Sequence, residues 1–320
     1  MFEFDQKGIR ISGTELYLDA SKKVQLSFVS HAHTDHVRRH DQVIATPETI
    51  SLIQLRHGKV AAIPLAYHQK YDRDDVKIEL FPSGHILGAA QILVERDGVR
   101  LVYTGDFKPG QNSTAVPLEV RQADILIMES TFGDPQFVFP KQWQIIEHLV
   151  KFVDKCFQSG TVPVVMGYAI GKAQEALKIL GDLNYQISVH PAMAPKVQVY
   201  VDHGIDFKNY QTYQGEDLRE RVLLIPPHLA NSRLVAQIWR TKKLMLTGWA
   251  VQPEAKKRYG ADEALALSDH ADFNQLIEYV HQVQPNKIFV THGFDSFVHH
   301  LRREGFQAEL LHESDQLSLF

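Results

Sequence analysis

The stretch HAHTDH at residues 31–36 constrains this chain more than any other part of the sequence. It carries three imidazoles and one carboxylate: His31, His33, Asp35 and His36. The apolar run 26–30 just before it is typical of a buried strand, so these side chains are expected to converge at the end of a sheet. Imidazole and carboxylate suit Zn²⁺, with Mn²⁺ or iron as alternatives. A polar loop would explain a lone HxH, but four matched positions favour a metal site.

The spacing within HAHTDH predicts two adjacent cations. His31 and His33 lie two residues apart and can point the same way from an extended segment, so they can share one metal. Asp35 and His36 continue around the turn and can take a second metal.

Two further candidate ligands lie in turns downstream. His85 stands in the glycine-bounded loop 83–85, and Asp106 follows the predicted strand 99–104. A single turn histidine or aspartate is commonly a local hydrogen-bonding residue. Together with HAHTDH, however, His85 is expected to complete the ligands of the first metal, and a carboxylate such as Asp106 can bridge two cations.

Four predicted strands each end in a residue of this kind. Strands 26–30, 99–104, 125–128 and 287–291 lead into HAHTDH, Asp106, Glu129 and His292. Because α/β proteins collect ligands at the carboxyl ends of strands, the site is expected at a single edge of one sheet. The turn at 96–98 also predicts a hairpin between strands 91–95 and 99–104.

The middle of the chain has a different pattern, which predicts a second module. An expected helix at 143–157, with Trp143 in its apolar stripe, is followed by a strand at 162–166 and a helix from about residue 171. This alternation favours a parallel sheet covered on both faces. We place domain boundaries at 1–135, 136–266 and 267–320. The turn 167–172 could hold a phosphate through Lys172, or it could simply close a β-α unit.

Composition narrows the function classes. The 320 residues are 44% hydrophobic with a net charge of −4, which argues mildly against coating nucleic acid by bulk electrostatics. The basic clusters at 38–40, 240–243, 256–258 and 302–303 would matter only if they lay around the site. The single Cys156 is expected to be a packed thiol. No targeting signal or membrane-spanning run is evident, so a cytoplasmic protein is expected.

Two adjacent divalent cations can lower the pKa of a shared water and stabilise charge on the attacked centre, which suits hydrolysis of phosphodiesters, lactams or thioesters. Attack at phosphorus also requires a proton for the departing alkoxide. His270 is the candidate general acid. Asp269, Asp272 or Glu129 could keep it protonated, because a nearby carboxylate favours imidazolium.

HAHTDH, SGHILGAAQ and TGDF resemble successive motifs of the metallo-β-lactamase fold. Glu129, His270 and His292 match three further motifs of its nucleic-acid-processing branch, the β-CASP nucleases. ESTFGDPQFVFP, GYAIGKAQ, TGWA, LALSDHADF and THGFDSF look most like the bacterial ligase-associated DNA exonuclease group. The resemblance covers essentially the whole chain. It implies an α/β fold, a four-layer αβ/βα sandwich with a β-CASP module inserted between Glu129 and His270, and substrate in the cleft between the two.

The resemblance also implies roles for individual residues. His31, His33 and His85 would hold one metal, Asp35, His36 and His292 the other, and Asp106 would bridge them. Asp35 would also serve catalysis, Glu129 would orient His270, and His270 would protonate the leaving oxygen. The residues expected near the nucleic acid are Ser130, Thr131, Lys172, Gly248, Trp249 and Ser268. In place of the arginine-rich segment associated with the group, the chain has residues 253–258, so we expect its contacts with the strand to differ there.

The residues and the resemblance leave four functions open. The leading hypothesis is a DNA exonuclease with two divalent metals, Zn²⁺ expected and Mn²⁺ the alternative, in which a metal-bridging hydroxide attacks phosphorus at DNA ends during repair. Association with DNA ligase or helicase repair proteins is implied by resemblance only, and a monomer is expected. The second hypothesis is an RNA endo- or exonuclease, because one contact can distinguish a 2′-hydroxyl. The others are a lactamase or thioesterase, and a non-catalytic nucleic-acid-binding module.

Overall fold

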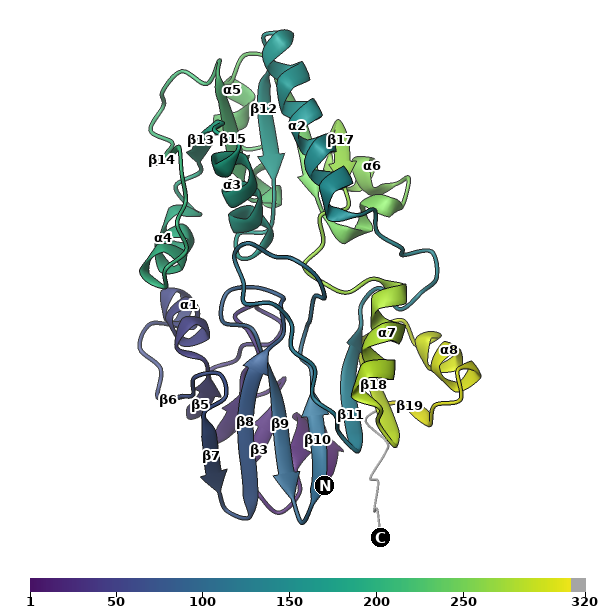
Figure 1. Ribbon diagram of the computed structural model, residues 1–320. Helices are drawn as coiled ribbons and strands as arrows, with labels where there is room; N and C mark the ends of the chain where they lie inside the picture. Colours follow the sequence, from purple (N-terminus) through teal and green to yellow (C-terminus); the bar gives the residue numbers. More distant parts are fainter. Residues whose placement is uncertain (312–320) are drawn as a thin grey trace. The chain divides into compact units, whose positions relative to one another are not determined.

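The computed structural model describes residues 1–311, which divide into two compact units (Figure 1). Among the described residues, the first comprises 1–110, 115–135 and 270–311. The second comprises 111–114 and 136–269. The sequence placed the second boundary after residue 266. The structure places it after Asp269, because Asp269 pairs with Lys172 of the second unit. No helix within residues 1–311 is long and apolar enough to cross a membrane.

The first unit contains two sheets. The strands of the first sheet run in chain order: β1 (Phe2–Asp5), β2 (Gly8–Ile11), β3 (Leu16–Leu18), β4 (Leu26–Phe28), β5 (Gln42–Ala45) and β6 (Ala62–Pro64). The second sheet has the order β19 (Ala308–Leu310), β18 (Lys287–Gly293), β11 (Ile125–Ser130), β10 (Val99–Tyr103), β9 (Ala90–Arg96), β8 (Val76–Pro82) and β7 (Lys70–Arg73). In the second sheet, β10, β11 and β18 are parallel neighbours.

The two sheets pack face to face through one apolar core. Phe28 of the first sheet and Ile92 of the second belong to it, and the rings of Phe2 and Phe289 meet edge to face with centroids 4.9 Å apart. The neighbouring residue Leu93 points to the opposite core, under helices α7 (Phe273–Val283) and α8 (Phe297–Arg303). Helix α1 (Pro47–His57) packs against β6. The expected four-layer αβ/βα sandwich is therefore confirmed.

The local predictions for this unit hold. β9 and β10 form the expected hairpin, and Asp97 and Gly98 adopt φ values of 52° and 78°, which suits a tight turn of type I′. The stripe predicted at 273–283 faces the core: Leu276, Val280 and Val283 are buried, with Phe273 and Ile277 packed beside them.

The second unit has one sheet in which every pairing is parallel, as the alternating pattern predicted. Its order is β14 (Tyr210–Thr212), β13 (Gln186–Val189), β15 (Arg221–Ile225), β12 (Val162–Met166), β16 (Thr241–Leu246) and β17 (Glu263–Leu265). Its helices are α2 (Gln142–Gln158), α3 (Lys172–Asp182), α4 (Ala194–Asp202), α5 (Arg233–Gln237) and α6 (Ala255–Tyr259), with 3₁₀ turns at Pro227–Leu229 and Gly248–Val251.

The buried face of helix α2 differs from the predicted one. Trp143 was expected in the apolar stripe, but it is 62% exposed, and the buried face instead includes Ile145 and Phe152. Cys156 lies on that buried face as expected, and burial raises its pKa to about 11. A thiol in this state is a packing group and a poor nucleophile.

Candidate metal centre

The candidate ligands come from the ends of strands in two sheets of the first unit. The segment 29–36 follows β4 of the first sheet, whereas Asp106, Glu129 and His292 follow or end β10, β11 and β18 of the second. The prediction of a single edge of one sheet was therefore wrong. Because the sheets stack face to face, strand ends from different sheets can converge as closely as neighbours within one sheet.

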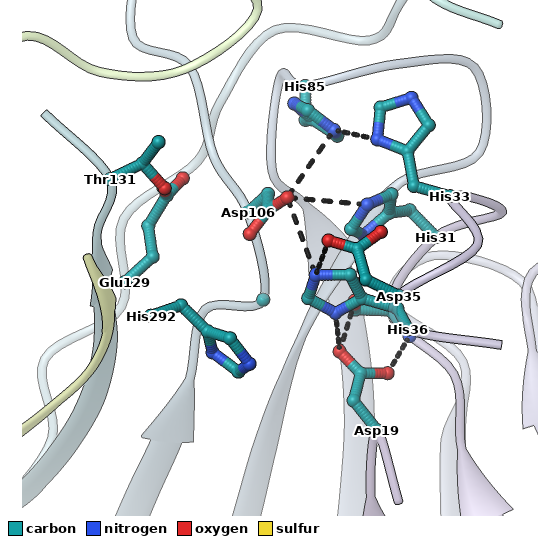
Figure 2. A network of polar contacts seen from close by, with 12 residues as sticks. Asp19, His31, His33, Asp35, His36, His85, Asp106, Glu129, Thr131 and His292 are labelled. Atoms are coloured by element: carbon teal, nitrogen blue, oxygen red, sulfur yellow. Dashed lines mark hydrogen bonds and ion pairs between the residues drawn. The ribbon is translucent and has the colours of Figure 1, made fainter. Parts of the chain in front are cut away.

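Four of the predicted ligands form a tight group. His31, His33, His85 and Asp106 each offer one ligand atom, and these atoms all lie within 4.8 Å of one another (Figure 2). Asp106 Oδ2 lies 3.4 Å from His31 Nε2 and 3.8 Å from His85 Nε2. His33 Nδ1 lies 3.0 Å from His85 Nε2. This is the set expected to hold the first metal, together with the expected bridging carboxylate.

The remaining predicted ligands are His36, Asp35 and His292. His36 Nε2 is 3.5 Å from Asp106 Oδ2 and 3.8 Å from Asp35 Oδ2. The ring of His292 lies beside His36, with centroids 5.4 Å apart. His292 has a φ of 48°, and a residue other than glycine in this region is commonly found at functional sites. Asp106 Oδ2 thus lies 3.4–3.8 Å from His31, His36 and His85, which belong to both of the expected ligand sets.

The residues present fit a divalent cation. His31 is fully buried, and its Nε2 has no hydrogen-bond partner among residues 1–311. A buried polar atom of this kind requires an explanation, and a cation would supply the missing partner. Burial and the neighbouring imidazoles hold the pKa of His31 well below its usual range, so this ring is neutral, as a metal ligand must be.

The carboxylate at the centre is ionised. Burial alone would raise the pKa of Asp106, but His36, His270 and His31 outweigh it and hold that pKa well below the usual range. Burial likewise opposes charge on His36, yet Asp106 and Asp19 raise its pKa well above normal. A cation binding at His36 would therefore displace a proton.

Sequence reasoning missed Asp19, whose hydrogen bonds fix the orientation of candidate ligands. Its Oδ2 accepts hydrogen bonds from His36 Nδ1 at 2.7 Å and Tyr103 Oη at 2.9 Å, and its Oδ1 accepts one from the Ser30 amide at 2.7 Å. The Ser30 hydroxyl donates to Asp19 and lies 2.9 Å from His31 Nδ1. Both rings therefore turn Nε2 toward Asp106 (Figure 2). Its place directly after β3, like that of the other ligands after their strands, was the available signal.

Glycine is required at position 105 for this arrangement. Gly105 has a φ of 52°, and a Cβ there would lie 2.5 Å from Ser30 Cβ and 2.6 Å from Ser30 Oγ. Such contacts would push Ser30 away from Asp19 and His31. The glycine before Asp106 therefore allows the two strand ends to approach.

Glu129 is the carboxylate that pairs with His270. His270 Nδ1 lies 2.9 Å from Glu129 Oε2 and 3.1 Å from Oε1. Glu129 is itself held by the Phe107 amide, at 2.7 Å, and by the Thr131 hydroxyl. The two alternatives are engaged elsewhere: Asp269 pairs with Lys172, and Asp272 accepts the Gln275 amide as the N-cap of α7. Asp106, Glu129 and His270 also bring ligand-type atoms within 4.8 Å of one another.

The residues predicted to contact nucleic acid need correction. Lys172 was expected to hold a phosphate, but it is 5% exposed and paired with Asp269, which favours the alternative of a turn that closes a β-α unit. Ser130 is 1% exposed and its hydroxyl donates to the Phe294 carbonyl. Gly248 and Ser268 are also buried, which leaves Thr131 and Trp249 partly accessible.

Comparisons with known proteins give a family match and several relatives. Residues 261–309, which contain His270 and His292, match the Zn-dependent metallo-hydrolase RNA specificity domain. The chain is 36% identical over 307 residues to a protein of Opitutus terrae named "Probable DNA ligase", covering 95% of this chain and 30% of that protein.

Two further relatives are named for RNA processing. The chain is 24% identical to an RNase J-like protein of Methanocaldococcus jannaschii, over 85% of this chain and 82% of the relative. It is 26% identical to the cleavage and polyadenylation specificity factor subunit 3 of Dictyostelium discoideum, over 74% of this chain and 38% of the relative.

Among solved structures, a protein of unknown function from Enterococcus faecalis superposes with a TM-score of 0.66 at 14% identity, over 91% of this chain and 80% of that one. At this identity the match supports the fold alone. In length, the chain spans under a third of the ligase-named relative and most of the RNase J-like one.

Proposed function

This chain belongs to the β-CASP group of metallo-β-lactamase-fold nucleases, and we propose that it is a DNA exonuclease that trims strand ends in repair. The observation that carries the proposal is the meeting of a buried ligand cluster with a separate histidine and carboxylate pair around Asp106. A thioesterase would not require that pair, because a thiolate can leave without first taking up a proton.

The proposal divides the candidate ligands between two cations. His31, His33 and His85 would hold one divalent cation and Asp35, His36 and His292 the other, with Asp106 shared between them. Zn²⁺ is proposed, with Mn²⁺ as the alternative, because imidazole and carboxylate donors accept both. Bound here, two such cations supply an activated water and neutralise charge on the phosphoryl group.

The chain's own residues supply the proton. Glu129 accepts a hydrogen bond from Nδ1 of His270, so Nε2 is the proposed proton-donating atom of that ring. A carboxylate at that distance favours the imidazolium form. His270 would then donate its Nε2 proton to the oxygen that leaves when the phosphodiester bond breaks. Thr131 and the Phe107 amide keep Glu129 from turning away.

DNA is proposed as the substrate because the ligase-named relative shares 36% identity over almost the whole of this chain. A ligase would then act on the ends that this enzyme prepares, and we propose the cytoplasm as the place of this repair role. The second candidate is an RNA nuclease. It is favoured by the RNase J-like relative, of which this chain covers 82%.

One digestion experiment tests the proposal. Purified protein loaded with Zn²⁺ or Mn²⁺ is incubated with DNA and RNA oligonucleotides of the same sequence, each labelled at either end. Stepwise shortening of DNA with little effect on RNA is the expected result, and the label position reports polarity. Preferential RNA cleavage would establish the second candidate. Failure to cleave either polymer, with both metals bound, would overturn the nuclease proposal.

A further inference from the structure

A cluster of aromatic and cationic side chains lies in the second unit and has no role in the chemistry described above. Its members are Tyr168, Trp249, Arg258 and Tyr259. The Arg258 guanidinium carbon is 5.9 Å from the centroid of the Trp249 ring and 5.7 Å from that of Tyr259. The hydroxyls of Tyr168 and Tyr259 are 3.3 Å apart. These contacts join four side chains from three separate segments into one surface.

Much of this cluster is open to solvent. Tyr168 is 41% exposed and Arg258 is exposed, while Trp249 and Tyr259 are partly buried. Trp249 rests edge to face on the buried Phe137, with centroids 5.2 Å apart, and Tyr259 packs against the core of the unit. Trp249 and Tyr259 are thus held in place by their packing. Tyr168 and Arg258 leave aromatic and guanidinium surface uncovered.

The cluster stands where parallel sheets bind ligands. Tyr168 comes two residues after β12 and Trp249 comes three residues after β16, and these strands are parallel neighbours. From β12 the chain moves to one side of the sheet, toward β13. After β15 it crosses to the opposite side of β12 within the sheet to form β16. Ligands of open α/β sheets bind outside the carboxyl ends of the strands at such a change of direction.

The chemistry of the surface selects one class of ligand. Aromatic rings and arginine planes stack on unpaired nucleobases, because every base has a π face. Lys256 and Lys257 flank Arg258 on α6 and are exposed, so cations that attract phosphates lie beside the rings. Bases within a duplex are already stacked on each other and cannot use such a surface. An acidic peptide would use the cations but would leave the rings without a partner.

We propose that Tyr168, Trp249, Arg258 and Tyr259 form a stacking site for an unpaired base of the strand being cleaved. The proposal deepens the proposed function and rests on it, since it assigns that nuclease a preference for single strands. It also gives Trp249 a contact with a base, whereas the resemblance placed this residue only near the nucleic acid.

The test compares binding of a strand that carries bases with binding of a strand that lacks them. Binding of the full chain is measured by fluorescence anisotropy with a single-stranded DNA oligonucleotide made resistant to cleavage by phosphorothioate linkages. A second oligonucleotide has the same backbone but abasic sites. Tyr168→Ala and Tyr259→Ala are expected to weaken binding of the first by about 5- to 100-fold, since stacking contributes about 1–3 kcal/mol per base. Binding of the abasic oligonucleotide is expected to be unchanged.

Matched variants separate stacking from other effects. Tyr168→Phe and Tyr259→Phe keep the rings and are expected to bind like the unmodified protein. Trp239→Ala removes an aromatic side chain that is 81% exposed and lies before β16, outside the cluster, and it should have no effect. If Tyr259→Ala fails to fold, Tyr168→Ala and Arg258→Ala decide the question, because both side chains are exposed.

Two results would overturn the stacking site. Alanine variants that bind both oligonucleotides like the unmodified protein would show that the rings contact no base. Equal losses for both oligonucleotides would show that the cluster acts on the backbone or on the fold. Failure of the nuclease proposal looks different, because the unmodified protein would then cleave neither DNA nor RNA. A nuclease that binds base-bearing and abasic strands equally would lose only the stacking site.

Discussion

Lys172 Nζ donates a hydrogen bond to Asp269 Oδ1, and both side chains are almost fully buried within the second unit. Lys172 is the first residue of α3, and Asp269 is the last residue of the unit before the chain continues into His270. This pair therefore anchors the segment that leads to the proposed general acid. Two buried charges depend on each other, because either one alone would lie in a poorly solvating environment.

Removal of one partner is expected to destabilise the protein strongly. Lys172→Met should lower the free energy of unfolding by about 3–5 kcal/mol, because it leaves the Asp269 carboxylate buried without its cation. The double variant Lys172→Met with Asp269→Leu should recover much of that loss. Denaturant unfolding monitored by circular dichroism measures both. A control is Lys178→Ala, which breaks an ion pair with Asp182 one turn apart on α3 and should cost about 0.5 kcal/mol or less. Equal losses for Lys172→Met and Lys178→Ala would contradict this account.

His270→Ala is expected to separate metal binding from proton transfer. The variant should keep its metal content, because His270 is not among the expected ligands, and should cleave about 100- to 10,000-fold more slowly. Metal analysis after purification, together with single-turnover cleavage of DNA, measures both properties. His299→Ala, a change to an exposed histidine outside the site, should leave both unaltered. Loss of metal from His270→Ala would make that residue a ligand and remove its assigned role.

Asp19→Ala is expected to weaken metal binding without removing a ligand. The hydrogen bonds of Asp19 fix His36 and, through Ser30, His31. Loss of such a supporting carboxylate typically costs about 10- to 100-fold in metal affinity. Titration against a competing chelator measures the affinity, and excess metal should restore cleavage. Asp5→Ala, which removes a carboxylate bonded to Tyr17 elsewhere in the first unit, should retain full affinity. Failure of excess metal to restore Asp19→Ala would indicate a collapsed site instead.

Gly105→Ala is expected to be harmful for a reason that Gly110→Ala lacks. Both glycines have positive φ, 52° and 93°, but a Cβ at 105 collides with Ser30 whereas one at 110 meets nothing within 4 Å. Gly110→Ala should therefore cost only the backbone strain, about 1–2 kcal/mol. Gly105→Ala should cost more and should also reduce metal affinity. Thermal unfolding and the same chelator titration distinguish the two, and equal behaviour would refute the role given to Ser30.

Features that depend on residues close together in the chain were predicted well from the sequence. The hairpin at Asp97–Gly98 and the stripe of α7 depend on backbone preference and on helical spacing, both of which are written in neighbouring residues. HAHTDH likewise gathers several donors within six positions, so its convergence with His85 and Asp106 could be anticipated.

Features that depend on distant packing were not predicted. Trp143 fits a helical stripe, but α2 turns a different face to its sheet. For Lys172 the sequence left open a phosphate contact or a turn that closes a β-α unit, because nothing near it indicated Asp269, which lies 97 positions away. Asp19 was overlooked since a lone aspartate after a short strand carries no motif. Its meaning comes from Ser30, His36 and Tyr103, which reach it only in the folded chain.

The interruption of the first unit by the second has a consequence for synthesis of the protein. Because β11 ends at Ser130 and β18 ends at Gly293, a ribosome must produce the entire intervening segment before the last candidate ligand emerges. A nascent or prematurely terminated chain would hold HAHTDH but would lack both His270 and His292. Assembly of the complete set of candidate ligands is thereby tied to completed translation of the insert.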